Sequence, residues 1–423
     1  MKARSILDKL AFTSLLILVA SLAVQKPSVT SLFKSTVSAT DVIFPFVIVL
    51  SLVALAFSKS PPKWNSVYWY FAAYTAAFFI SSIFAANLNS ALAKTFATSY
   101  LVGLAVLCVE LIDTRERLLY VICAWLAGAT IPVFIGMATL IVYYLSPDNS
   151  LLPYFTYHYG AVPVGNFPRL SSTFVSASMF CSYLTATAFL LLAVRSTDRI
   201  PKRIWWSFFC LVLVCSLFTV SVGLGAFGLA LTSWFYFSTS HRSRKVVGLA
   251  GLGVFAASIA AALFALQAHA TAPYSYVIPL INTEIFPSGR ILVWTEALKS
   301  FANNIFFGTG PGTAAASVMY QNTSGEYSFL TDAHNSFLSA ATQTGVIGLA
   351  AFVAMVIQLI RLGCRVALSS PIRSALAIGF VCTFILQGLT GSFEDARHLW
   401  ILIGIMVAAA ALEGQGRDST AEV

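Results

Sequence analysis

Residues 334–360 read HNSFLSAATQTGVIGLAAFVAMVIQLI, a polar pair followed at once by a long apolar run. An apolar run of about 20 residues is what a helix needs to cross a bilayer. His334 and Asn335 stand where this run meets the longest polar interval of the chain. A polar, titratable pair is costly to keep at the mouth of a membrane helix, so we interpret it as part of a functional site.

Composition extends this interpretation to the whole chain. Hydrophobic residues make up 58% and charged residues 10% of the 423 residues, whereas soluble domains carry about 25% charged residues. The net charge of +9 could indicate a nucleic-acid partner, but the basic residues are spread over short loops without a dense run. We therefore predict an all-α, polytopic membrane protein that contacts membrane lipids and binds no nucleic acid.

Hydropathy predicts about twelve transmembrane helices within a single integral membrane domain covering residues 1–423. Residues 221–225 are interpreted as a tight turn between two short helices, or as the break of one helix. Two long loops remain, residues 146–173 and 267–335, and the second is expected to carry short interfacial helices. The predicted spans are 8–24, 37–57, 65–86, 91–111, 117–145, 174–194, 204–220, 224–239, 246–266, 336–360, 374–391 and 398–413.

The distribution of basic residues predicts the orientation of these spans. With the N-terminus inside, 18 of the 25 Lys and Arg residues fall on the cytoplasmic side. That asymmetry indicates two cytoplasmic termini and places both long loops on the outer side. The seven basic residues left outside are Lys26, Lys34, Lys94, Arg169, Arg290, Lys299 and Arg397.

The second long loop contains one amphipathic segment, residues 290–299. Ile291, Trp294, Ala297 and Leu298 would share a face suited to the bilayer surface. The glycines of residues 307–312 then end any helix, and without a GxxxxGK pattern they predict a turn, not a nucleotide site.

Two of the outer arginines are candidate ligands for a phosphate group. Arg169 and Arg290 would each lie at headgroup depth, just before an expected helix. A guanidinium binds phosphate oxygens bidentately and stays charged at any relevant pH. Snorkelling to lipid headgroups or pairing with a carboxylate is the structural alternative for each arginine.

His334 is the candidate general base. Asp332 would be the N-cap of the helix that follows, and the positive end of that helix would keep the imidazole neutral and able to accept a proton. A histidine bonded within an interfacial loop is the alternative. Small residues on the same helix, at Ala341, Gly345 and Gly348, are interpreted as packing positions.

Other polar and sulfur-containing residues carry weaker signals. The loop formed by Glu394, Asp395, Arg397 and His398 could contribute to the site, although solvated loop charges are more common. The seven cysteines lie in or beside apolar spans without a CxxC pair or clustered histidines. We predict neither a disulfide nor a metal site from them.

These motifs resemble the O-antigen ligase and polymerase family of bacterial membrane glycosyltransferases. The resemblance rests on His334-Asn335 with the glycine pair Gly345 and Gly348, and on the two arginine segments at 169–174 and 290–310. It covers residues 40–413 in topology but is motif-specific only around 165–180 and 285–350. Many relatives carry an arginine after a serine in the turn where this chain has Ser221-Val222-Gly223, so that basic group is absent or supplied elsewhere.

The resemblance implies glycan transfer at the periplasmic face of the bacterial inner membrane, in lipopolysaccharide or exopolysaccharide biosynthesis. The donor would be a glycan on undecaprenyl diphosphate, and the acceptor lipid A core or another lipid-linked glycan. Arg169 and Arg290 would stabilise the departing diphosphate and His334 would take the proton of the attacking hydroxyl. Asp332, Trp294 and Asn335 would contact substrate. Two guanidiniums can balance a diphosphate, so the transfer is predicted to be inverting, metal-independent and without a cofactor.

Two alternatives stay open. Within the family, the chain could be a ligase or a polymerase of lipid-linked repeat units. From another class, a lipid-linked glycan flippase or transporter would also have about twelve spans. Transporters place functional charges near mid-membrane, whereas the candidate residues here collect at one surface, which favours an enzyme.

Overall fold

A computed structural model of the chain shows an all-α fold. It describes residues 2–26, 30–32, 35–56, 65–156, 168–197, 199–238, 246, 250–251, 253, 276–278, 283–285, 290–321, 327–367, 371–392 and 395–421.

Apolar helices make up most of the described chain. They are α1 Lys2–Ser21, α2 Ala39–Ala56, α3 Val67–Ile83, α4 Leu88–Leu111, α5 Arg115–Leu145, α6 Leu152–Phe155, α7 Ala177–Val194, α8 Lys202–Phe218, α9 Gly223–Ser238, α11 Arg290–Asn303, α12 Ser336–Ala367, α13 Pro371–Phe380 and α14 Arg397–Ala421. A π-helical turn, Val381–Leu386, and a 3-10 turn, Gln387–Leu389, continue α13.

Within the described part of the chain, five helical segments are long and apolar enough to cross a membrane: Leu88–Leu111, Arg115–Leu145, Ala177–Val194, Ser336–Cys364 and Ile372–Leu389. Shorter apolar helices are Ala39–Ala54, Val67–Ile83 and Arg397–Leu412. Every predicted span overlaps a helix except 246–266, most of which lies outside the described residues. The all-α membrane fold is thus confirmed, whereas the count of twelve spans stays a prediction.

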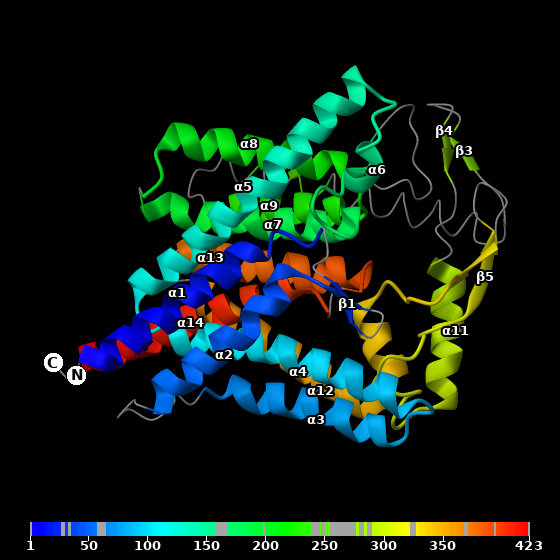
Figure 1. Cartoon of the computed structure of the whole chain (residues 1–423), viewed down its shortest axis with the longest axis horizontal. Helices are drawn as coiled ribbons and strands as arrows, with labels where there is room; N and C mark the ends of the chain where they lie inside the picture. The colour runs from blue at the N-terminus through cyan, green and yellow to red at the C-terminus, as the bar shows by residue number, and fades with distance from the viewer. Residues whose placement is uncertain are drawn as a thin grey trace.

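The helices run roughly alongside one another, and the two ends of the bundle differ (Figure 1). Both chain termini lie at one end, whereas α6 of the first long loop and α11 with the two hairpins of the second long loop lie at the other. In the second loop, β3 Tyr276–Ile278 pairs with β4 Thr283–Ile285, and β5 Val318–Gln321 pairs with β6 Tyr327–Leu330. A third hairpin, β1 Thr30–Leu32 with β2 Ser35–Val37, follows α1. The described part of the second loop therefore carries one helix and two hairpins.

Helix α7 is buried along nearly its whole length and lies in the middle of the bundle. Two of its buried hydroxyls are paired with other helices, because Trp125 Nε1 donates to Thr187 Oγ1 (3.0 Å) and Gln387 Nε2 donates to Thr185 Oγ1 (3.1 Å). These hydrogen bonds replace the ones that the hydroxyls would make with water and so offset the cost of burying them. Because α7 is held this firmly, the segment that precedes it has a rigid support.

Residues 219–222 separate α8 from α9 as a tight turn. Val220 adopts a φ of 44°, and the Gly223 amide donates to Ser221 Oγ (3.2 Å). The carbonyl of Gly223 accepts a hydrogen bond from Gln387 Nε2 (3.1 Å). Of the two interpretations left open by the sequence, the turn between two helices is confirmed.

Helix α12 is interrupted at Gly345, which has φ 66° and ψ −165°. Only glycine adopts this backbone conformation readily. The break frees carbonyls of the first half of α12, so that Thr309 N donates to Thr342 O (2.8 Å) and Gly310 N to Gln343 O (3.1 Å). The glycine-rich turn at 308–312 therefore docks onto α12. Gly345 is more than the packing position predicted for it, because it admits this turn.

We expect Gly345→Ala to destabilise the protein by about 3 kcal/mol or more, because it combines a forbidden φ with a clash. A Cβ at this position would lie 2.3 Å from the carbonyl oxygen of Phe306. Gly228→Ala is the matched control, since Gly228 lies inside helix α9 and a Cβ there meets nothing within 4 Å. Thermal unfolding of the detergent-solubilised protein measures both; equal Tm values for the two variants would contradict the role given to Gly345.

Candidate active site

Arg169 belongs to a short segment, residues 168–176, that is tied to its surroundings by backbone hydrogen bonds. The amides of Ser171 and Ser172 both donate to Phe155 O (2.9 Å each), and Leu170 N donates to Phe218 O (2.8 Å). Ser172 has a φ of 49°, and its hydroxyl donates to Pro132 O (2.7 Å). This small-residue sequence therefore folds into a buried platform, and half-buried Arg169 stands on it.

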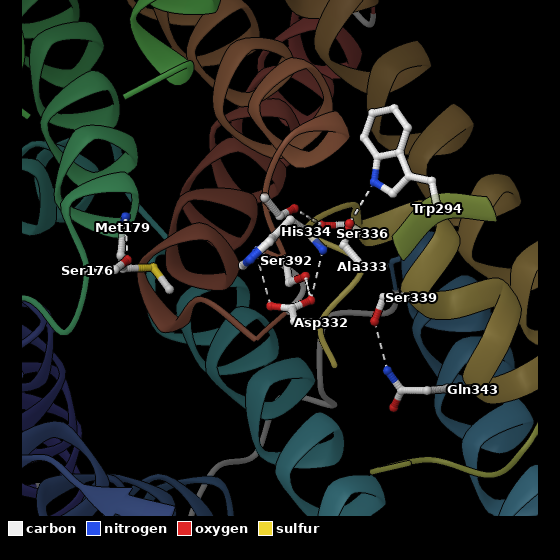
Figure 2. Close-up of polar contacts among 11 residues, drawn as sticks. Ser176, Met179, Trp294, Asp332, Ala333, His334, Ser336, Ser339, Gln343 and Ser392 are labelled. Atoms are coloured by element: carbon white, nitrogen blue, oxygen red, sulfur yellow. Dashed lines mark hydrogen bonds and ion pairs between the residues drawn. The ribbon is translucent and has the colours of Figure 1, made fainter. Parts of the chain in front are cut away.

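Arg290 is the first residue of α11 and Trp294 stands one turn later. Val293 and Ala297 are buried, and α11 packs on α12. The face predicted to lie on the bilayer surface is thus divided between two environments. Ala297 is covered by protein, whereas Leu298 is 56% exposed. Trp294 Nε1 donates to the carbonyl of Ala333 (2.7 Å), so α11 is bound directly to the residue that precedes His334 (Figure 2).

His334 is held in an uncommon backbone conformation with a φ of 46°. Its amide donates to Asp332 Oδ1 (2.9 Å), and its ring Nδ1 lies 3.3 Å from Asp332 Oδ2. Half of the His334 side chain is exposed, so the ring remains accessible to a substrate. Both oxygens of one carboxylate thus hold the histidine that the sequence singled out (Figure 2).

The N-cap of α12 is Asn335, and the prediction that Asp332 caps this helix is wrong. Asn335 Oδ1 accepts hydrogen bonds from the amides of Phe337 and Leu338, both at 3.0 Å. Asp332 lies four residues before the helix and is used by His334 instead. The predicted contact of Asn335 with substrate stays a prediction, and it would have to use the amide nitrogen of the side chain.

Electrostatic interactions join these segments into one site. Burial lowers the pKa of the Arg290 guanidinium, repulsion from Arg169 lowers it further, and attraction by Asp332 acts in the opposite direction. Arg169, Arg290 and Asp332 come from three separate segments, yet their charges are close enough to interact. Arg290 thus lies near both Arg169 and the loop that contains Asp332 and His334, and a joint catalytic role for these residues stays a prediction.

Asp332 remains an anion under physiological conditions. Burial raises the pKa of its carboxyl group, but the hydrogen bonds from His334, attraction by that histidine when it is protonated, and the hydroxyl of Ser392 outweigh burial and lower the pKa to about 2. Because folding lowers this pKa, the ionised carboxylate stabilises the folded protein fully above about pH 4, the ordinary carboxyl pKa. This stabilisation is lost as the pH falls towards 2. The carboxylate beside His334 is therefore present throughout the neutral range.

The outer loop before α14 is paired to other helices, which corrects the interpretation of its charges as solvated. Arg397 binds Asp41 of α2 through two hydrogen bonds, Nε to Oδ1 and Nη2 to Oδ2, both 2.6 Å long. Asp395 forms an ion pair with Lys94 of α4. His398 is buried in the bundle, with Nε2 3.2 Å from Ser182 Oγ. Glu394 lies outside the described residues.

Sequence patterns missed two contributors to this site. Ser392, whose hydroxyl donates to Asp332, lies 60 residues further along the chain, and no local spacing indicates the contact. The hydrogen bond from Trp294 to Ala333 joins residues 39 apart, and no sequence pattern indicates it either.

Among the described residues, no group of three or more His, Cys, Asp or Glu side chains could hold a metal ion. The cysteines of this part of the chain are free thiols.

A comparison with known families assigns this arrangement. Residues 172–353 match the model of the O-antigen ligase family. Over this stretch the chain is similar to O-antigen ligases. The matched stretch runs from the platform before α7 to the middle of α12 and contains Arg290 and His334, while Arg169 lies three residues before it.

This match confirms the resemblance seen in the sequence and, with the apolar helices, indicates a membrane protein of glycosyltransferase type. Among curated proteins, no sequence matches the chain. The family as a whole uses lipid-linked glycans and acceptors of the lipid A core type.

Proposed function

We propose that this protein is an O-antigen ligase-like enzyme that transfers a glycan from undecaprenyl diphosphate to an acceptor sugar hydroxyl. The observation that carries the proposal is the electrostatic interaction of Arg290 with both Arg169 and Asp332, at the side of His334. Two cations beside a potential proton acceptor fit a reaction that releases a polyanion and deprotonates a hydroxyl.

In this proposal the two arginines bind the diphosphate of the donor. Like charges that are held close together repel each other, as Arg169 repels Arg290. A diphosphate placed between them removes that repulsion, and its charge grows as the bond to the sugar breaks. Interactions that strengthen as charge develops lower the barrier of the reaction.

His334 accepts the proton. The oxygen of the acceptor hydroxyl forms a bond to the anomeric carbon of the donor sugar, and the hydroxyl proton moves to the imidazole. The bond between that carbon and the phosphate oxygen breaks, and its electron pair leaves with undecaprenyl diphosphate. A single displacement of this kind inverts the anomeric configuration. We propose that the guanidiniums, rather than a metal ion, balance the leaving charge.

We place the reaction at the periplasmic face of the bacterial inner membrane. Support comes from the excess of 18 over 7 basic residues on the side assigned to the termini. It also comes from the position of α11 and the hairpins at the end of the bundle opposite the termini (Figure 1). Undecaprenyl-linked glycans would reach this site from the outer leaflet, and both termini would be cytoplasmic.

The acceptor decides between a ligase, a polymerase and a transporter, and the glycolipids of a deletion strain distinguish the three. For a ligase we expect long glycan chains that stay on their lipid carrier while lipid A core is left uncapped. A polymerase would leave single repeat units, and a transporter would leave donor glycan in the inner leaflet. Complementation by the wild type but not by His334→Asn ties the phenotype to the site. An unchanged glycolipid profile in the deletion strain would refute the proposal.

A further inference from the structure

The carboxylate of Asp332 has three donors around it, and one of them is not part of the histidine. Oδ1 accepts the backbone N–H of His334 (2.9 Å) and the hydroxyl of Ser392. Oδ2 lies 3.3 Å from His334 Nδ1. Figure 2 shows Asp332 between the serine and the histidine. Both oxygens of the carboxylate are thus in contact with protein groups.

Ser392 is presented by a loop that is fixed on both sides. One residue before it, the carbonyl of Gly391 accepts a hydrogen bond from Ser336 Oγ of α12 (3.2 Å). After it, Asp395 is paired with Lys94, and Arg397 is bound bidentately to Asp41. A hydroxyl held in this way can fix a neighbouring carboxylate at little further cost in conformational entropy.

We propose that Asp332 and Ser392 are positioning residues for His334, with the serine fixing the carboxylate and the carboxylate fixing the imidazole. This inference rests on the function proposed above, because it gives His334 the role of proton acceptor. It also replaces the predicted contact of Asp332 with substrate, since an anion beside a diphosphate would repel it.

The positioning has a specific chemical result. An acceptor on the Nδ1 side of a histidine selects the tautomer that carries its proton on Nδ1. The carboxylate of Asp332 lies on that side, so Nε2 keeps the lone pair that receives the proton of the acceptor hydroxyl. A serine hydroxyl on Oδ1 restrains the carboxylate from turning away from the ring, which keeps the imidazole in one orientation.

The tautomer can be measured without any substrate. We expect nitrogen NMR of the full-length protein labelled with ¹⁵N-histidine to show His334 protonated on Nδ1 at neutral pH, with the signal assigned by its loss in His334→Asn. Ser392→Ala should shift the His334 signal towards a mixture of tautomers, and Ser392→Thr should restore the wild-type spectrum. Identical His334 signals in the wild type and Ser392→Ala would overturn the proposal.

Transfer to the native acceptor in complemented membranes provides the second readout. We expect Ser392→Ala to slow transfer about threefold to thirtyfold, as the loss of a hydrogen bond to a charged group does. Asp332→Asn should slow it more, and the double variant should be no slower than Asp332→Asn, because the serine acts through the carboxylate. Additive losses would show that Ser392 acts independently and would refute the relay.

Thr390→Val is the matched control, because Thr390 lies in the same loop and its hydroxyl donates to Gln387 O (3.2 Å), away from Asp332. It should change neither the tautomer nor the rate by more than about twofold. If Ser392→Ala shows the expected tautomer shift but His334→Asn transfers glycan at the wild-type rate, the positioning of His334 stands and the proposed function is refuted. The positioning of His334 and the proposed function can therefore be refuted independently.

Discussion

Replacing His334 with Asn should reduce glycan transfer by about 10²-fold to 10⁴-fold, the range that general bases contribute. Asn is the informative substitution because position 334 has a φ of 46°, which asparagine tolerates better than most residues. The backbone N–H that bonds to Asp332 is also retained. The loss can therefore be assigned to the ring. The measurement is the initial rate of glycan attachment in membranes that contain equal amounts of each protein.

His334→Gly offers a stricter version of this test. Glycine accepts the same backbone conformation and leaves a space at a position where half of the side chain is exposed. Added imidazole should restore part of the activity, and more of it as the pH rises through the pKa of free imidazole. Transfer by His334→Asn at the wild-type rate would show that the histidine is not the proton acceptor.

Replacing Arg290 should have an effect of similar size. We expect Arg290→Ala to lose about 10²-fold to 10³-fold in rate, as the removal of a preorganised donor to a developing negative charge does. Arg290→Lys keeps the charge but not the planar pair of donors, so it should also lose most of the activity. Full activity in Arg290→Lys would contradict bidentate binding of phosphate.

Lys299→Ala is the matched control on the same helix. Its ammonium group pairs with exposed Glu296 (2.7 Å) near the other end of α11, and exposed pairs of this kind contribute little to stability. The rate of this variant should stay within about twofold of the wild type. Combining Arg169→Gln with Arg290→Ala should cost less than the product of the single losses, because both groups bind one diphosphate.

Hydropathy and charge predicted most of the fold because those signals are local. Every predicted span that falls among the described residues coincides with a helix. The break of α12 at Gly345 was not predictable, since a glycine on a helix face looks the same whether it serves packing or a positive φ. Only the docking of the turn at 308–312, more than thirty residues upstream, decides between these roles.

The candidate site was predictable as a set of residues but not as a network. The rarity of basic residues on the outer side singled out Arg169 and Arg290, and the position of His334 singled out the base. Asp332 and Asn335 are both good capping residues, and spacing alone could not tell which one caps α12. Ser392 and the pair Asp41–Arg397 come from remote parts of the sequence, and only the folded chain brings them together.

The bond from Trp294 to Ala333 has a consequence for the choice of donor. It ties the helix that starts with Arg290 to the residue next to His334, so the spacing between the proposed phosphate ligand and the proposed proton acceptor is set before any substrate arrives. The one sugar that lies between the diphosphate and the attacking hydroxyl has to match this fixed spacing. Selectivity should therefore be strict for that first sugar and permissive for everything attached beyond it.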